Sequence, residues 1–153
     1  SLGKKKGYKR YGLTPVGLIG SRDQHSFLQL IMDGVKDKTV SFIKVAAAET
    51  DTAMPSISLN GLEGCDFVNG LNLGELINAQ CSATMHALVQ EGISVDIIEL
   101  ERLDESSAGF LIYYFELLTS ATGIMLGINT YDQPGVEVGK RILKTMLTAG
   151  KQD

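Results

Sequence analysis

The amino-acid sequence predicts an α/β fold in which a parallel sheet carries helices on both faces. Short apolar or β-branched runs alternate along the chain with longer segments of helical periodicity. Helix-like segments also connect the successive strand-like runs, as parallel strands require. The 153 residues, 44% apolar and 21% charged, suit a single globular domain. We therefore expect a basic, flexible lead-in over residues 1–12 and one α/β domain over residues 13–153.

The first third of that domain reads as strand, helix, strand. Residues 16–19 form a short apolar run closed by Gly20, which is typical of a buried strand. Apolar residues at helical spacing then predict a helix that opens after Ser21 and stops at Gly34. The β-branched content of residues 39–45 predicts the second strand.

The middle of the chain begins with an ambiguous stretch. Residues 46–71 mix an alanine run with proline, serine and threonine, so they hold either a short helix around residues 62–68 or a surface excursion. Asn72 followed three residues later by Glu75 is a capping box, and it predicts a helix that ends at Gly92. Residues 95–100 are the third strand, placed near the sheet edge by their polar interruptions.

Two helices close the chain, over residues 104–126 and 135–149. The first is apolar enough to imitate a membrane span. Glu116 near its middle, and the lack of Lys/Arg asymmetry at its ends, favour a helix buried in a protein core. A third possibility is an apolar helix that docks onto a partner protein.

Charge and cysteine usage narrow the class of protein. The net charge of −4 argues against nucleic-acid binding. Five of the 14 cations lie in the first eleven residues, which we interpret as a solvated tail; a basic arm for nucleic acid or membrane is the alternative. Cys65 and Cys81 form no metal-binding pattern, and no apolar signal segment opens the chain. We expect a cytoplasmic protein with free thiols, no metal site, no cofactor and no membrane partner.

His25 is the first candidate for chemistry. It lies in the first turn of the helix that follows residues 16–19, at the carboxyl end of a predicted strand, where ligands of parallel sheets bind. The positive helix end favours a neutral imidazole, which can give or take a proton. A histidine that only packs or caps is an equally good interpretation. His86 lies within a helix away from other polar residues, and we assign it no role.

The second candidate is the segment GIMLGINTYDQPGVEVGK, residues 123–140, in which one helix ends and another begins. Asp132 suits an N-cap, and Pro134 lies just inside the predicted helix start. Gln133 and Lys140 are seven residues apart, about two helical turns, so both can face a small anionic or polyhydroxyl ligand. The simpler interpretation is a surface helix in which Lys140 pairs with Glu137.

These two segments resemble the glucose-6-phosphate isomerase family. Residues 123–140 are similar to its C-terminal signature, and GSRDQHSFLQLIMDG, residues 20–34, is similar to its Gln-His segment. Both occur in the family's order, and the resemblance extends over nearly the whole chain. Two departures are local: Glu116 is followed by two leucines where the family often has His-Lys, and Pro134 stands where it often has Trp.

The resemblance implies a sugar-isomerase type of fold and an aldose–ketose isomerase that interconverts glucose 6-phosphate and fructose 6-phosphate through a cis-enediol. His25 and Lys140 match the residues that open the sugar ring, and Gln133 matches a substrate contact. The family implies a homodimer whose active-site histidine comes from the neighbouring subunit, and no metal or cofactor.

The chain matches only about the C-terminal third of the family, so the resemblance also implies an incomplete subdomain of a larger protein. The family's catalytic glutamate, its enediolate-stabilising arginine and its phosphate-binding loop have no match here. We expect the isolated chain to have little or no activity. A non-catalytic sugar-phosphate-binding regulatory module is the alternative interpretation.

Overall fold

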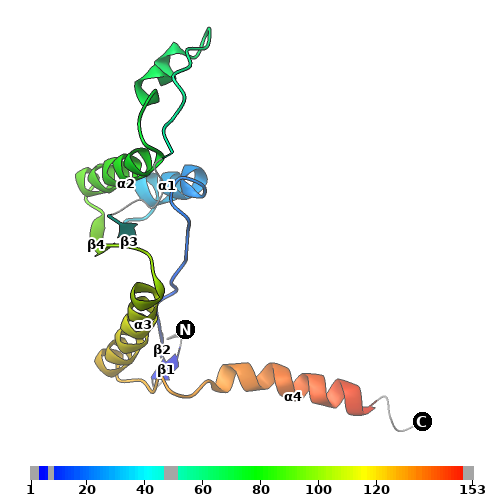
Figure 1. The fold of residues 1–153 in the computed structure, drawn as a ribbon. Coiled ribbons are helices and arrows are strands. Elements are labelled where there is room, and N and C mark those ends of the chain that lie inside the picture. Colours follow the sequence, from blue (N-terminus) through cyan, green and yellow to red (C-terminus); the bar gives the residue numbers. More distant parts are fainter. Residues whose placement is uncertain (1–3, 7–8, 47–51, 150–153) are drawn as a thin grey trace. The chain divides into compact units, whose positions relative to one another are not determined.

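The computed structural model describes residues 4–6, 9–46 and 52–149. The chain divides into two compact units, one of residues 17–109 and one of residues 1–16 together with 110–153. Figure 1 follows the chain through the elements of both units.

The unit of residues 17–109 is built on two parallel strands, β3 (Thr39–Val45) and β4 (Ser94–Leu100). They pair in register from Thr39 opposite Ser94 to Val45 opposite Leu100. The helices α1 (Gln24–Asp33) and α2 (Leu73–Gln90) cover one face of this pair (Figure 1). The α/β class and the parallel pairing predicted from the sequence are confirmed.

A small core holds this unit together. Ile31 of α1, Leu88 of α2 and Ile93 before β4 are buried, and Leu88 is only 1% exposed. Half-buried side chains of α1, β3 and β4 pack around these three: Phe27, Leu28, Met32, Val40, Phe42 and Val95. Because strand side chains alternate between faces, Ile43 points away from this core and is 49% exposed.

Both ends of α2 carry the start and stop signals that the sequence predicts. Asn72 accepts a hydrogen bond from the Gly74 amide at 2.8 Å, and the full capping box with Glu75 is present. At the other end Gly92 has φ +74°, and the Ile93 amide donates to the Leu88 carbonyl at 3.0 Å. Glycine suits this position because it enters the left-handed region without steric cost.

The ambiguous stretch between β3 and α2 contains a short 3₁₀ helix, η1 (Glu63–Val68), which confirms the expected helical turn. Residues 47–51 of the stretch, with most of its alanine run, lie outside the described residues. The rest projects from its unit as an excursion (Figure 1). Two backbone hydrogen bonds close its base: the Met54 amide donates to the Leu71 carbonyl, and the Leu73 amide donates to the Thr52 carbonyl.

The predicted strand at residues 16–19 is wrong. These residues have no strand conformation, and Val16 and Ile19 are 58% and 57% exposed. A strand needs a neighbour for its backbone hydrogen bonds, and no described strand pairs with this run. An apolar run alone therefore did not suffice to form a strand.

In the other unit, β1 (Lys4–Lys6) and β2 (Lys9–Tyr11) pair antiparallel within the stretch expected to be a flexible lead-in. This pairing was not visible in the sequence, because lysine is uncommon in strands and the run shows no alternation. The last residues, 150–153, lie outside the described residues.

The helices α3 (Glu105–Leu126) and α4 (Pro134–Ala149) form where the sequence predicts them. Burial of α3 was the wrong expectation, because Gly123 is the only buried residue of this fully described helix. Burial needs an apolar face from another element, and within the unit that holds residues 110–126 of α3 no other described element packs closely against it. Among the described residues α3 is also the one helix long and apolar enough to cross a membrane. Core helices of soluble proteins share that property.

Candidate functional site

His25 is the second residue of α1, on its first turn, and its side chain is exposed. Directly before it the chain makes a tight turn through Gly20, Ser21 and Arg22. Gln24 fixes the start of the helix, since its side-chain amide donates to the Thr84 hydroxyl of α2 at 3.3 Å. The histidine thus stands at an exposed helix start that is tied to the neighbouring helix.

A cavity of about 370 Å³ lies beside His25. It follows one side of α1, and its walls are His25, Leu28, Gln29, Met32, Asp33 and Glu91. The Gln29 side-chain amide donates to the Asp33 carboxylate, and Lys36 Nζ lies 3.8 Å from Glu91 Oε2. The lining combines polar and charged side chains with the apolar Leu28 and Met32.

Of the residues that line this cavity, only His25 was predicted from the sequence. Gln29 and Asp33 follow His25 at intervals of four residues, so all three lie on one side of α1. That spacing was visible in the sequence. Glu91 comes from the end of α2, and only the packing of the two helices reveals its position.

Gln133 and Lys140 belong to the other unit, and the chain reaches them through the capped end of α3. The Ile128 amide donates to the Gly123 carbonyl at 2.9 Å, and Gly127 has φ +62°, the pattern of a Schellman cap. The chain then folds back so closely that a Cβ atom on Gly123 would collide with the side chain of Thr130. Glycine at residue 123 is therefore required by packing.

The start of α4 differs slightly from the predicted one. The helix begins at Pro134, so Gln133, which was expected to follow the cap, occupies the N-cap position, and Asp132 lies one residue earlier. The Gln133 carbonyl accepts a hydrogen bond from the Val136 amide at 3.0 Å. Proline is favoured at the first helical position because that residue needs no amide donor.

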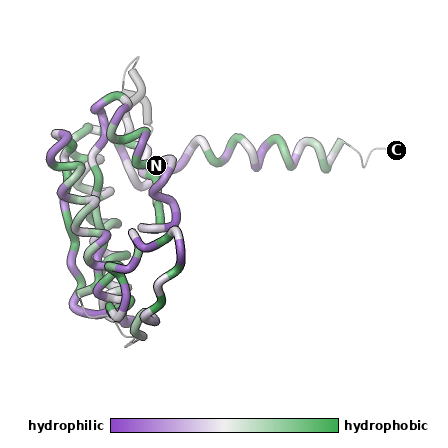
Figure 2. Tube along the Cα trace, turned by 90° about the horizontal axis from the view of Figure 1, so that it is seen from above, coloured by the Kyte–Doolittle hydropathy of each residue, from purple (hydrophilic) through white to green (hydrophobic). Residues whose placement is uncertain are grey.

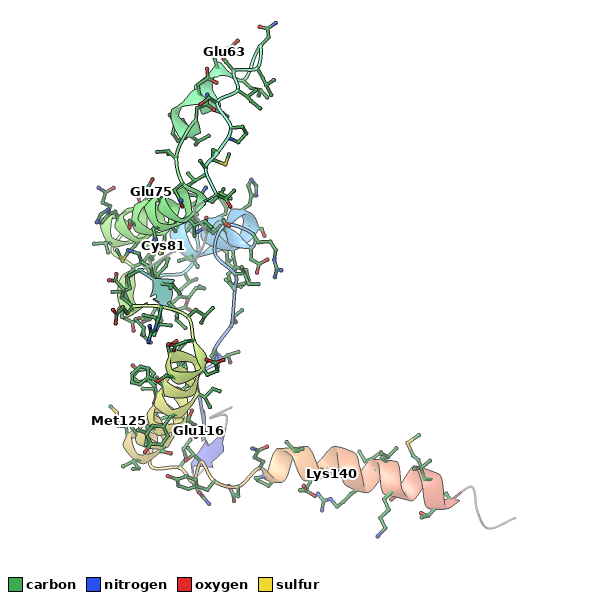
Figure 3. All side chains as sticks on the ribbon, in the orientation of Figure 1. Glu63, Glu75, Cys81, Glu116, Met125 and Lys140 are labelled. Atoms are coloured by element: carbon green, nitrogen blue, oxygen red, sulfur yellow. The ribbon has the colours of Figure 1, made fainter. Side chains whose placement is uncertain are left out.

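Lys140 pairs with Glu137, as the simpler interpretation proposed. Its Nζ donates to Glu137 Oε1 at 2.7 Å, and the two side chains are 68% and 58% exposed. Figure 3 labels Lys140 on α4. Figure 2 shows hydrophobic and hydrophilic residues alternating along α4. An exposed ion pair of this kind is worth about 0–1 kcal/mol, so a ligand can compete with Glu137 for the lysine.

The structure therefore gives the geometry of two parts of the candidate site, His25 with its cavity and Gln133 with Lys140. They belong to different compact units, so each is defined only within its own unit. Among the described residues no group of three or more His, Cys, Asp or Glu side chains could hold a metal ion. Cys65 and Cys81 are free thiols.

Comparison with known proteins first defines the class. The structure superimposes with a TM-score of 0.85 on a crystal structure of a hypothetical protein from Thermus thermophilus. The two are 32% identical, and the match covers 95% of this chain and 35% of the other. The class is that of α/β proteins with a sugar-isomerase type of fold.

The sequence comparisons then define the family. Residues 6–153 match the phosphoglucose isomerase family, and the chain belongs to it. It is 63% identical to a glucose-6-phosphate isomerase of Campylobacter jejuni over 97% of this chain and 36% of the relative. It is 41% identical to one of Rubrobacter xylanophilus over 86% of this chain and 30% of the relative. The chain thus spans about a third of the length of these curated relatives.

Proposed function

We propose that this chain is part of an aldose–ketose isomerase that interconverts glucose 6-phosphate and fructose 6-phosphate. The observation that carries the proposal is the family match over residues 6–153, which includes both candidate segments. The reaction opens the sugar ring and then moves a proton between C1 and C2 through a cis-enediol. Neither step requires a metal or an organic cofactor.

Ring opening is the part of the reaction that we assign to this chain. It needs one group to take a proton from the ring hydroxyl and another to stabilise or protonate the ring oxygen. His25 is exposed beside a cavity and can exchange a proton. Lys140 supplies a cation whose exposed pairing with Glu137 is weak, and Gln133 offers both a donor and an acceptor to the sugar hydroxyls.

The proton transfer between C1 and C2 needs a carboxylate base and a cation near the enediolate. We propose that these groups, and the loop that holds the phosphate, lie outside these 153 residues. We also propose that the active enzyme is a cytoplasmic homodimer in which His25 acts in the neighbouring subunit's site. The isolated chain should accordingly have little or no isomerase activity.

A chimera tests this function. The chain replaces the segment it matches in the Campylobacter jejuni relative, and turnover of glucose 6-phosphate is followed in a coupled assay. We expect an active chimera, and a loss on the order of 100-fold in kcat for His25→Asn, which is the usual contribution of a general acid–base. His86→Asn is the matched control, since His86 lies on an exposed face of α2.

Two results would contradict the proposal. One is full turnover by the isolated chain, which would mean that the missing groups are not needed. The other is a folded chimera that binds glucose 6-phosphate without converting it, which would favour the regulatory module instead.

A further inference from the structure

Asp23, directly before α1, makes contacts that its position does not lead one to expect. It occupies the N-cap position, where an aspartate side chain usually accepts a hydrogen bond from a helix amide. Its side chain makes no such bond. Its Oδ2 instead accepts the backbone amide of Ile19 at 2.9 Å, four residues back along the chain.

The same two residues are joined a second time through their backbones. The Asp23 amide donates to the Ile19 carbonyl at 3.0 Å, so Ile19 and Asp23 exchange hydrogen bonds in both directions. Between them, the Arg22 amide donates to the Gly20 carbonyl at 2.9 Å. These bonds close residues 19–23 into a compact turn, which we call the Asp23 turn.

The Asp23 turn holds an unfavourable backbone conformation. Ser21 has φ +63° and is, among the described residues, the only residue other than glycine with a positive φ. Such conformations persist where surrounding contacts enforce them, and they are enriched near functional sites. Here the enforcing contacts are those of Asp23 with Ile19 on one side and with Arg22 on the other.

Arg22 pairs with the Asp23 carboxylate from the solvent-exposed side of the turn. Its Nε donates to Asp23 Oδ1 at 3.0 Å, with the arginine side chain 69% exposed and the aspartate side chain 30% exposed. The Arg22 guanidinium, and then the Ile19 amide, hold the pKa of Asp23 below its ordinary value. The carboxylate is therefore charged at neutral pH and remains a strong acceptor for the amide.

His25 lies two residues after Asp23, so the direction in which the first turn of α1 starts depends on this turn. The Gln24–Thr84 hydrogen bond fixes the helix to α2, and the Asp23 turn fixes the chain that enters it. We propose that Asp23 is a positioning residue for His25, which it orients through the closed turn of residues 19–23. This inference rests on the proposed role of His25 in ring opening.

The variants that test this role remove the contacts of Asp23 in steps. Asp23→Ala removes both the charge and the acceptor for the Ile19 amide, whereas Asp23→Asn keeps an oxygen acceptor. Asp37→Ala is the matched control, because Asp37 also pairs with a cation one residue away, Lys38 at 2.6 Å, in an exposed turn that leads to no site residue. His25→Asn is the reference for loss of ring opening.

Two substrates separate a positioning role from a general structural one. In the chimera, Asp23→Ala should lower kcat for glucose 6-phosphate by about 10- to 100-fold, because a small displacement of a catalytic group is costly. Turnover of an open-chain aldose phosphate too short to form a stable ring should be unchanged. Asp23→Asn should recover most of the rate, and Asp37→Ala should match the parent.

Several outcomes would overturn the inference. Equal losses for both substrates would make Asp23 a structural residue only. Retention of kcat by Asp23→Ala, while His25→Asn loses it, would exclude positioning by Asp23. If His25→Asn itself keeps full activity, it is the proposed function that fails.

A measurement on the 153-residue chain does not depend on isomerase activity. By NMR, Asp23→Ala should increase hydrogen exchange at the Ile19 amide and shift the imidazole resonances of His25, and Asp37→Ala should do neither. An unchanged Ile19 amide and unchanged His25 resonances in Asp23→Ala would refute the turn as the source of His25 orientation.

Discussion

The two compact units contrast in how well their side chains are buried. The unit of residues 17–109 has a small core, built from α1, α2 and the strand pair. In the unit that contains α4, the large apolar residues of that helix are exposed, from Val138 at 45% to Met146 at 69%. The part of the site around His25 is therefore held by contacts made within its own unit. The part around Lys140 depends on local helix geometry.

This contrast indicates which part of the chain supplies most of its stability. Burial of apolar side chains supplies most of the free energy of folding, so substitutions in the core of the first unit should have the largest effects. Substitutions at helix ends and in exposed ion pairs should have smaller ones.

The largest effect is expected for Leu88→Ala. This side chain is 1% exposed at the centre of the core, and its removal should lower the free energy of unfolding by about 2–5 kcal/mol. Val89→Ala is the matched control, since the next residue of α2 is 56% exposed and should cost much less. Urea denaturation followed by circular dichroism measures both. Equal losses for the two variants would show that Leu88 is not a core residue.

A smaller effect is expected at the start of α2. Asn72→Ala removes the side-chain oxygen that accepts the Gly74 amide and should cost about 1 kcal/mol. Asn72→Ser keeps a good capping oxygen and should retain most of the stability. A loss of similar size in both variants would mean that Asn72 acts through something other than capping.

Acid should weaken the start of α3. The Ser107 amide, which donates to Asp104 Oδ1 at 2.8 Å, and then Arg102 hold the pKa of Asp104 below its ordinary value. A carboxylate with a lowered pKa in the folded state contributes stability above its unfolded pKa of about 4 and loses it as the pH falls through the folded pKa. Denaturation midpoints at pH 7 and pH 3 should therefore differ less in Asp104→Asn than in the parent. An identical difference in both proteins would contradict this.

The smallest effect on stability is expected at Lys140. Because its pairing with Glu137 is exposed, Lys140→Ala should change the free energy of unfolding by less than about 1 kcal/mol. The same substitution should lower isomerase turnover of the chimera, whereas Lys144→Ala, one turn further along α4, should not. Loss of activity that is accompanied by unfolding would remove the case for a direct role.

The sequence predicted those elements whose signals are local. The β-branched run of β3, the Asn72–Glu75 capping box and the glycine that ends α2 all lie within a few residues of the structure they specify. The strand predicted at residues 16–19 failed because a strand depends on a distant partner, which local sequence does not reveal. The exposure of α3 was missed for the same reason, since burial depends on what packs against a helix.

The candidate site divides in the same way. The sequence predicted that His25 lies in the first turn of a helix and Lys140 within the last helix, and the structure has them there. The roles of His25, Gln133 and Lys140 stay predictions. The cavity beside His25 and the Asp23 turn were not found. The cavity depends on the packing of α1 against the end of α2. The Asp23 turn depends on a side chain that accepts the amide of Ile19, four residues earlier, instead of capping its helix.

We propose that His25 of one subunit and Lys140 of its neighbour act in one ring-opening step. The most direct test is the kcat of the chimera for glucose 6-phosphate with His25→Asn, Lys140→Ala and both together. Because groups that act as a unit are not additive, we predict that the double variant loses about as much as the more damaging single variant. Losses that multiply would contradict a shared step.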